Sequence, residues 1–306
     1  MTTTESPAVA PLVSRDDPAD EELVRGPRES PVSIIGSGML LLVFACYFLT
    51  PLWWLFVAST KTLGDLSTTP GLWFGSHFHL FSNIGEMVSY NDGIFVRWAL
   101  NSVLYAGVGS GVGTLLAAMA GYAFAKYAFP GRDWIFNSIL AGVLVPATAL
   151  ALPLFLIAVK LGLVDTYWSV FIPSVVSPFG VYLARVYAAA AVPDELLEAA
   201  RLDGAGELRT FVTVAMRLMA PALVTIFLLQ FVAIWNNFLL PLIMLQNDEL
   251  YPLTLGLYSW NSQINNAPHV RLFAIVGSFV SVVPLIIVFL SLQRFWRSGL
   301  AAHAVK

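Results

Sequence analysis

The stretch PDELLEAARLDGAGELRTFVTVAMR, residues 193–217, is a polar interruption between two apolar segments that are each long enough to cross a membrane. Pro193 has a backbone φ that suits the start of a helix, and Asp194 and Glu195 favour the positive end of the helix dipole. Apolar residues then recur at helical spacing. The sequence therefore predicts a short amphipathic helix that begins at Pro193 and ends near Asp203.

A sharp turn and a second short helix follow in the sequence. Gly204 and Gly206 are poor helix formers and supply the backbone freedom for a turn, after which the pattern from 208 to 216 is helical again. Ala199 and Ala200 lack bulk, so another protein's surface can approach the backbone closely. We interpret the stretch as a docking surface, the alternative being a helix that lies on the membrane surface.

The residues EAARLDGA, with Phe211 and Pro221 downstream, resemble the coupling loop of ABC importer permeases. In that family the loop sits in a cleft of a cytoplasmic ATPase subunit and passes the closure of the ATPase to the membrane helices. Members commonly carry a proline where this chain has Arg217, so we expect a different exit from the loop. The resemblance implies that the ATPase-coupling residues are Glu198, Ala199, Ala200, Asp203, Gly204 and Ala205. Residues 193–217 are called the coupling loop below.

The composition is that of a polytopic membrane protein. The 306 residues are 58% hydrophobic and 11% charged, with a mean hydropathy of +0.75. Six segments without charged residues can cross a hydrocarbon core of roughly 30 Å, which predicts an all-α fold with six transmembrane helices. The resemblance implies the type I ABC importer permease fold. The expected spans are 34–57, 98–122, 134–159, 167–184, 218–245 and 272–293.

The distribution of basic residues predicts the orientation. With the N-terminus inside, twelve of the 16 Lys and Arg residues fall in cytoplasmic parts and four in outer parts. Both termini and the coupling loop are therefore expected to be cytoplasmic. Residues 1–30 lack apolar periodicity, which predicts a disordered cytoplasmic tail ahead of a permease domain at 31–306.

Segment two contains five glycines, four of them at alternate positions from 107 to 113, but no nucleotide-binding motif. No Lys-Ser or Lys-Thr follows these glycines, so they do not form a phosphate-binding loop. Glycines four apart let membrane helices pack closely, which predicts that Gly107 with Gly111, and Gly109 with Gly113, form a helix contact face. We therefore expect the chain to be no enzyme and to bind no cofactor, with ATP and Mg held by a partner ATPase.

Segment five holds the densest polarity within the predicted membrane region, in FLLQFVAIWNNFLLPL. Gln230 and Asn237 are seven residues apart and are expected to share a helix face. Amides beside an aromatic ring suit a neutral solute with many hydroxyls, but asparagines also join membrane helices by hydrogen bonds. The candidate substrate path is Gln230, Trp235, Asn236 and Asn237.

The resemblance narrows to the maltose-type carbohydrate-uptake permeases, of the MalG kind. AGYAFAKYAFPGRDWIF, LPLFLIAVKLGLVDTYWSV, WNNFLLPL and SGLAAHAVK all resemble that group, and the similarity covers nearly everything from Trp98 to Lys306. It implies import of a mono-, di- or oligosaccharide across the cytoplasmic (inner) membrane of a prokaryote. The implied partners are a second, homologous permease, a dimer of cytoplasmic ATPase subunits and an extracytoplasmic sugar-binding protein. The cytoplasmic tail at 294–306 is a second candidate ATPase contact, through Gly299, Ala304, Val305 and Lys306.

Three other functions stay open from the sequence. An ion-coupled secondary transporter generally needs ionisable groups at membrane depth, and the six segments contain none. An ABC permease for a polyol or glycerol phosphate would fit the same pattern. An intramembrane hydrolase needs a nucleophile with a base or a metal cluster, and His77 with His79 has no Cys or carboxylate cluster beside it. We predict no catalytic residue, no metal site and no nucleic-acid partner.

Overall fold

The computed structural model describes residues 31–263, 265 and 267–303. The predicted tail at residues 1–30 and the candidate contacts Ala304, Val305 and Lys306 lie outside the described residues. The chain divides into a short N-terminal unit that ends at Leu52 and a unit from Trp53 onward. The described part of the first unit is the beginning of one apolar helix, and the candidate site lies in the second unit.

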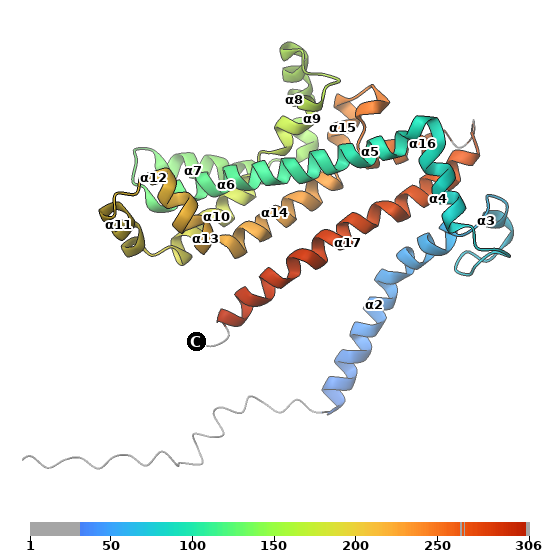
Figure 1. Cartoon of the computed structure of the whole chain (residues 1–306), viewed down its shortest axis with the longest axis horizontal. Helices are drawn as coiled ribbons and strands as arrows, with labels where there is room; N and C mark the ends of the chain where they lie inside the picture. Colours follow the sequence, from blue (N-terminus) through green and yellow to red (C-terminus); the bar gives the residue numbers. More distant parts are fainter. Residues whose placement is uncertain (1–30, 264, 266, 304–306) are drawn as a thin grey trace, which may run out of the picture. The chain divides into compact units, whose positions relative to one another are not determined.

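Helices make up all the regular structure of the described residues, as the sequence predicts (Figure 1). They are α2 (Pro31–Ser59), α3 (Asp65–Thr68), α4 (Leu80–Ser89), η1 (Tyr90–Gly93), α5 (Ile94–Val103), η2 (Leu104–Val108), α6 (Gly109–Lys126), α7 (Arg132–Ala141), η3 (Gly142–Leu144), α8 (Ala147–Leu161), α9 (Tyr167–Ser174), α10 (Pro178–Ala191), α11 (Asp194–Leu202), α12 (Glu207–Thr210), η4 (Phe211–Ala215), α13 (Met216–Leu218), α14 (Ala220–Trp235), α15 (Leu239–Met244), η5 (Asp248–Leu250), α16 (Leu253–Ser262) and α17 (His269–His303).

The six predicted spans are all present when each bent helix pair counts as one. Four are single stretches of sufficient length and apolarity, at Ile34–Ser59, Leu80–Lys126, Tyr167–Ala191 and His269–Gln293. The other two are pairs of helices joined at a sharp bend, of 107° between η3 and α8 and of 82° between α13 and α14. The apolar composition thus predicted the number of spans but not their shape.

The predicted span at 98–122 belongs to the longer stretch Leu80–Lys126. The predicted spans at 167–184 and 218–245 are each interrupted. The span predicted at 167–184 is interrupted after Ser174 and restarts at Pro178, because proline at the first position of a helix has no N–H to continue the preceding one. The span predicted at 218–245 ends as a helix at Trp235, and the separate short helix α15 follows.

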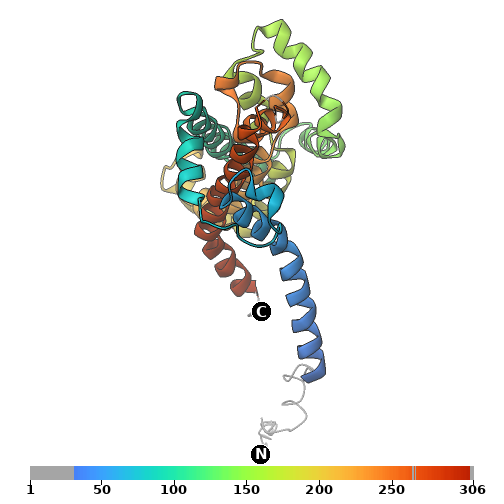
Figure 2. The ribbon, with the colours of Figure 1, turned by 90° about the vertical axis from the view of Figure 1, so that its right-hand side faces the viewer.

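Small residues bring α6 against α10 and α14, which lie beside it (Figures 1 and 2). A Cβ on Gly121 would lie 2.5 Å from the Cβ of Ala184, so the two helices touch at backbone distance there. Gly109 and Gly113 face Ile234 and Gln230 of α14. The predicted contact face is therefore half right.

The other glycine pair makes no such contact. A Cβ on Gly111 would meet nothing within 4 Å, and one on Gly107 would meet only Val103 of the same span.

The helix α8 is less closely packed than α6. It extends away from the packed helices in both views, and its leucines are largely exposed (Figures 1 and 2). An exposed apolar helix of this kind suits lipid or a membrane partner.

A buried cluster fixes the coupling loop to these helices. Leu197 of α11 and Phe211 of η4 pack with Tyr122 of α6 and Ala188 of α10. The ring centroids of Tyr122 and Phe211 are 5.2 Å apart. The inner face of the coupling loop is thus part of the hydrophobic core.

Candidate coupling site

The coupling loop consists of two short helices joined by a turn, as the sequence predicts. Pro193 is the N-cap of α11, which runs Asp194–Leu202, and Asp203 is its C-cap. Gly204 has a φ of +76°, a left-handed conformation that side chains with a Cβ rarely adopt. The second helix begins at Glu207 and continues through η4 to Leu218. The turn depends on Gly204 in particular.

The outer face of the loop is exposed and mixes acidic with apolar side chains. Among the predicted coupling residues, Glu198, Ala199, Asp203 and Gly204 are exposed, whereas Ala200 and Ala205 are half-buried. Leu202 is 89% exposed. A leucine left in solvent at the centre of a polar loop indicates a surface that another protein covers.

An ion pair joins the two helices across the turn. The Arg201 Nε donates to the Glu207 Oε1 at 2.9 Å, and this hydrogen bond and the carboxylate charge raise the pKa of Arg201. Because Arg201 is turned toward Glu207, the carboxylate of Glu198 remains exposed without a described ion pair. The exposed face is therefore acidic, and it fits a partner surface that is basic with an apolar pocket.

Two residues at the end of α6 hold the loop in place. The Lys126 Nζ donates to the Asp194 Oδ1 at 2.8 Å, and the Tyr127 hydroxyl donates to a carboxylate oxygen of Glu207. Burial and this hydrogen bond raise the pKa of Tyr127, so its hydroxyl stays protonated and donating. Both residues lie in the stretch AGYAFAKYAFPGRDWIF that carries the resemblance, but the sequence alone assigns a role to neither.

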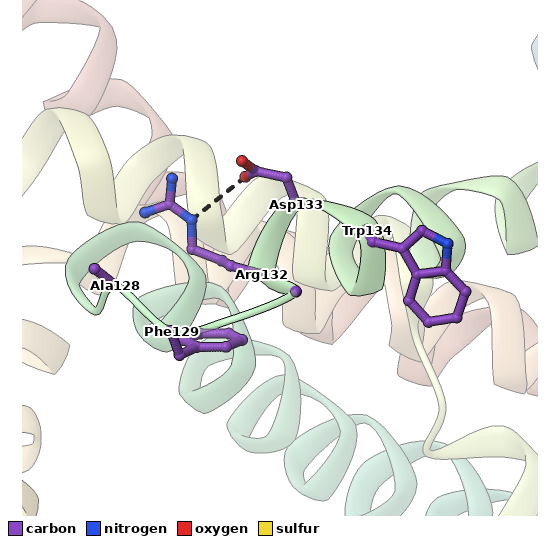
Figure 3. Close-up of a pocket in the computed structure, with 6 residues that line it drawn as sticks. Ala128, Phe129, Arg132, Asp133 and Trp134 are labelled. Carbon is purple, nitrogen blue, oxygen red and sulfur yellow. Dashed lines mark hydrogen bonds and ion pairs between the residues drawn. The ribbon is translucent and has the colours of Figure 1, made fainter.

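The turn after Tyr127 forms a shallow hollow lined by Ala128, Phe129, Gly131, Arg132, Asp133 and Trp134 (Figure 3). The Arg132 Nε lies 3.3 Å from the Asp133 carboxylate, and Arg185 of α10 approaches the same carboxylate at 3.7 Å. In Figure 3 the indole of Trp134 lies away from Arg132, on the far side of Asp133. These contacts attach the turn to α10 beside the coupling loop.

Gln230, the first candidate on the substrate path, lies between helices. It is 7% exposed, and its Nε2 donates to the Ser174 carbonyl at 3.0 Å. In an unbroken helix that carbonyl would accept from residue 178, but Pro178 has no N–H. Gln230 therefore satisfies the carbonyl that the helix break leaves free, and Gly113 provides the room for its amide.

The remaining candidates on the substrate path lie in different surroundings. Trp235 is buried and stacks on Phe231, with ring centroids 5.6 Å apart. Asn236 is exposed, and its Nδ2 donates to the Val232 carbonyl one turn back at 2.8 Å. Asn237 lies beyond the end of α14, so the expectation that it shares a helix face with Gln230 is wrong.

The described residues contain no group of three or more His, Cys, Asp or Glu that could hold a metal ion. Gly299 lies in α17, where the structure describes only its backbone. The candidate coupling site consists of α11, α12 and the end of α6.

Comparison with known proteins places this chain among transport-system membrane components. The family model described as binding-protein-dependent transport system inner membrane component matches residues 113–300. The chain is 36% identical over 284 residues to the arabinooligosaccharides transport system permease protein AraQ of Bacillus subtilis, covering 91% of this chain and 99% of the relative. It is 30% identical over 273 residues to the lactose transport system permease protein LacG of Rhizobium radiobacter, covering 89% and 96%.

The fold also matches a solved structure. A chain of a bacterial ABC transporter involved in the import of the acidic polysaccharide alginate superposes with a TM-score of 0.75 at 24% identity, covering 93% of this chain and 99% of that one.

Proposed function

We propose that this chain, which belongs to the family of binding-protein-dependent transport system inner membrane components, is a permease subunit of an ATP-driven sugar importer and forms half of its pore. A family member of this kind is a multi-pass inner membrane protein that works with other components of its transport system. Membership supports this function over an ion-coupled secondary transporter. A second, homologous permease would supply the other half of the pore.

The coupling loop is the observation that carries the proposed partnership with an ATPase. Its inner face is anchored in the core by Leu197, while its outer face presents Glu198 and the exposed Leu202. ATP and Mg would be bound and used by a dimer of cytoplasmic ATPase subunits. Both termini would be cytoplasmic, with the tail contact at Gly299, Ala304, Val305 and Lys306 as a second attachment.

The proposed cargo is a neutral sugar delivered by an extracytoplasmic binding protein. The support comes from relatives whose names specify arabinooligosaccharides and lactose, and from predicted spans that lack charged residues. A polyol or glycerol phosphate is the second candidate. The identity of the sugar depends on the binding protein as much as on this chain.

In the proposed cycle, ATP-driven closure of the ATPase dimer moves the coupling loop and rocks the spans from inward-open to outward-open. The bends before α8 and before α14 are where the chain already departs from a straight helix. Gln230 would keep the break before α10 in shape through its bond to Ser174.

Purification with the native partners tests the proposal. The wild-type chain is expected to retain a homologous permease and an ATPase dimer in mild detergent, and Leu202→Glu is expected to lose at least nine-tenths of the ATPase because it puts a carboxylate into the docking face. Arg97→Met is the control, since it removes an exposed ion pair to Glu249 outside the coupling loop. Retention of the ATPase by Leu202→Glu at the wild-type level would count against this docking surface.

The cargo is tested on the binding protein encoded with these partners. Thermal shift with arabinotriose, lactose, maltotriose, glycerol and glycerol 3-phosphate separates the two cargo classes. Stabilisation by a sugar alone supports the proposal, and stabilisation by glycerol or its phosphate alone replaces it with the second candidate.

A further inference from the structure

We propose that Lys126 and Tyr127, consecutive residues at the end of α6, form a two-point clamp that makes the coupling loop move together with α6. The inference rests on the proposed function, since it identifies how a force on the loop would enter the membrane helices. It assigns a positioning role to two residues outside the coupling loop.

The first point of the clamp is a partly buried ion pair. Lys126 ends α6, its side chain is 7% exposed, and its Nζ lies 2.8 Å from the Asp194 Oδ1 at the start of α11. Burial of the ammonium reduces screening by solvent on the lysine side, and loss of Asp194, whose side chain is 74% exposed, would leave the Lys126 charge poorly solvated. The Lys126 side chain is far less exposed than either partner of the pair between Arg97 and Glu249, whose side chains are 52% and 57% exposed.

The second point reaches the other helix of the loop. The Tyr127 hydroxyl donates to Glu207, the first residue of α12, and Glu207 also accepts from Arg201 in the last turn of α11. The Tyr127 ring packs edge-on against Tyr122, with centroids 5.7 Å apart, so the ring has little freedom to follow the loop independently. Glu207 is thus shared by α6, α11 and α12.

Two contacts fix an orientation that one contact cannot. Asp194 and Glu207 lie on opposite sides of the turn at Gly204, where the backbone adopts a left-handed conformation. The buried cluster around Leu197 and Phe211 attaches the loop as well, and Lys126 alone would tie only the start of α11 to the end of α6. With Tyr127 as well, the first turns of both helices are held to the same end of α6.

The packing of α6 would pass this movement onward. Gly121, five residues before Lys126, contacts α10 at backbone distance, and Gly113 receives Gln230 of α14. A displacement of the clamped end therefore acts on three packed helices. If the two contacts only stabilised the fold, the same contacts would be present, but the distance between the loop and α6 could change when ATP binds. A clamp requires that distance to stay constant.

Pulsed electron paramagnetic resonance distinguishes these two roles. Spin labels are placed at the exposed positions Arg209 and Leu116 of the full transporter in nanodiscs, with Cys46→Ser removing the native thiol of the chain. The distance is measured without nucleotide and with ATP trapped on the ATPase. In the otherwise wild-type chain it is expected to stay as one narrow distribution in both states.

In the double variant Lys126→Met with Tyr127→Phe, ATP is expected to shift the distance distribution or to increase its width at least twofold. The ATPase is expected to remain bound at wild-type stoichiometry. Arg97→Met is the matched control and is expected to leave the distribution unchanged, because its ion pair joins α5 to Glu249 of η5, outside the coupling loop. Lys126→Asp alone is also expected to broaden or shift the distribution when ATP is bound. Reversing the pair, Lys126→Asp with Asp194→Lys, is expected to remove at least half of that change.

An unchanged distribution in the double variant would overturn the clamp, and so would a broadening already present without nucleotide that ATP does not alter. A double variant that does not assemble is replaced by Tyr127→Phe alone, for which the same two outcomes apply. If no ATPase purifies with the wild-type chain, the proposed function fails and the clamp with it; a bound ATPase with an indifferent variant removes the clamp alone.

Discussion

The contact between α6 and α10 at Gly121 gives the sharpest prediction from the fold. A Cβ at this position would lie 2.5 Å from the Cβ of Ala184 and 2.6 Å from the backbone nitrogen of Arg185. Carbon atoms at optimal separation are about 3.5–4.0 Å apart, so Gly121→Ala must push the two helices apart by roughly 1 Å. The backbone of α10 cannot move aside as a flexible side chain would.

The expected cost follows from two opposing effects. Overpacking of a well-packed site costs about 1–3 kcal/mol, whereas replacing glycine by alanine in a helix interior contributes about 0.5–1 kcal/mol of stability. Gly121→Ala is therefore expected to be destabilising by about 1–2 kcal/mol. The same substitution at Gly111, where a Cβ meets nothing within 4 Å, keeps only the favourable effect.

The two variants form a matched pair on one helix. Their unfolding midpoints are compared with that of the wild-type chain in the same detergent, with Gly121→Ala expected below it and Gly111→Ala at or above it. Equal midpoints for the two variants would refute the close approach of α6 and α10. Gly113→Ala is expected between them, because the added methyl meets the movable amide of Gln230.

Two further predictions concern single residues. Gln230→Leu leaves the Ser174 carbonyl without its amide donor and is expected to lower stability by about 0.6–2 kcal/mol in the same unfolding assay. Asn236→Ala, at an exposed amide, is expected to change stability by less than about 0.5 kcal/mol, and a loss as large as that from Gln230→Leu would contradict a structural role specific to Gln230. Gly204→Val is expected to reduce ATP-dependent uptake at least tenfold by straining the turn, and Gly206→Ala, where φ is −71°, is the control; normal uptake by Gly204→Val would mean that the turn is not needed for coupling.

The coupling loop could be predicted from sequence because its signals are local. A proline with two acidic residues marks the start of α11, and Gly204 marks its end, so both boundaries fall within a residue or two of the prediction. The clamp could not be predicted in this way. Lys126 and Tyr127 acquire their roles only when the fold brings Asp194 and Glu207 to the end of α6, 68 and 80 residues further along the chain.

The prolines show why the bends and breaks of the spans could not be predicted from the sequence. Pro146 is the N-cap of α8 at the 107° bend, and Pro178 starts α10 after a break. Pro153 and Pro284 sit inside continuous helices. A proline removes one donor in every case, and at Pro178 the Ser174 carbonyl that this leaves free accepts from Gln230, which is distant in sequence.

The positions of the rigid and bent parts suggest where a transport movement has to occur. Gly121 holds α6 against α10, and the clamp holds the coupling loop against the same end of α6, so movement within this group would break backbone contacts and a partly buried ion pair. The chain leaves the group at the 82° bend between α13 and α14, beside the buried Met219. We therefore expect ATP-driven motion to change the angle at this bend while the distance between α6 and α10 stays constant.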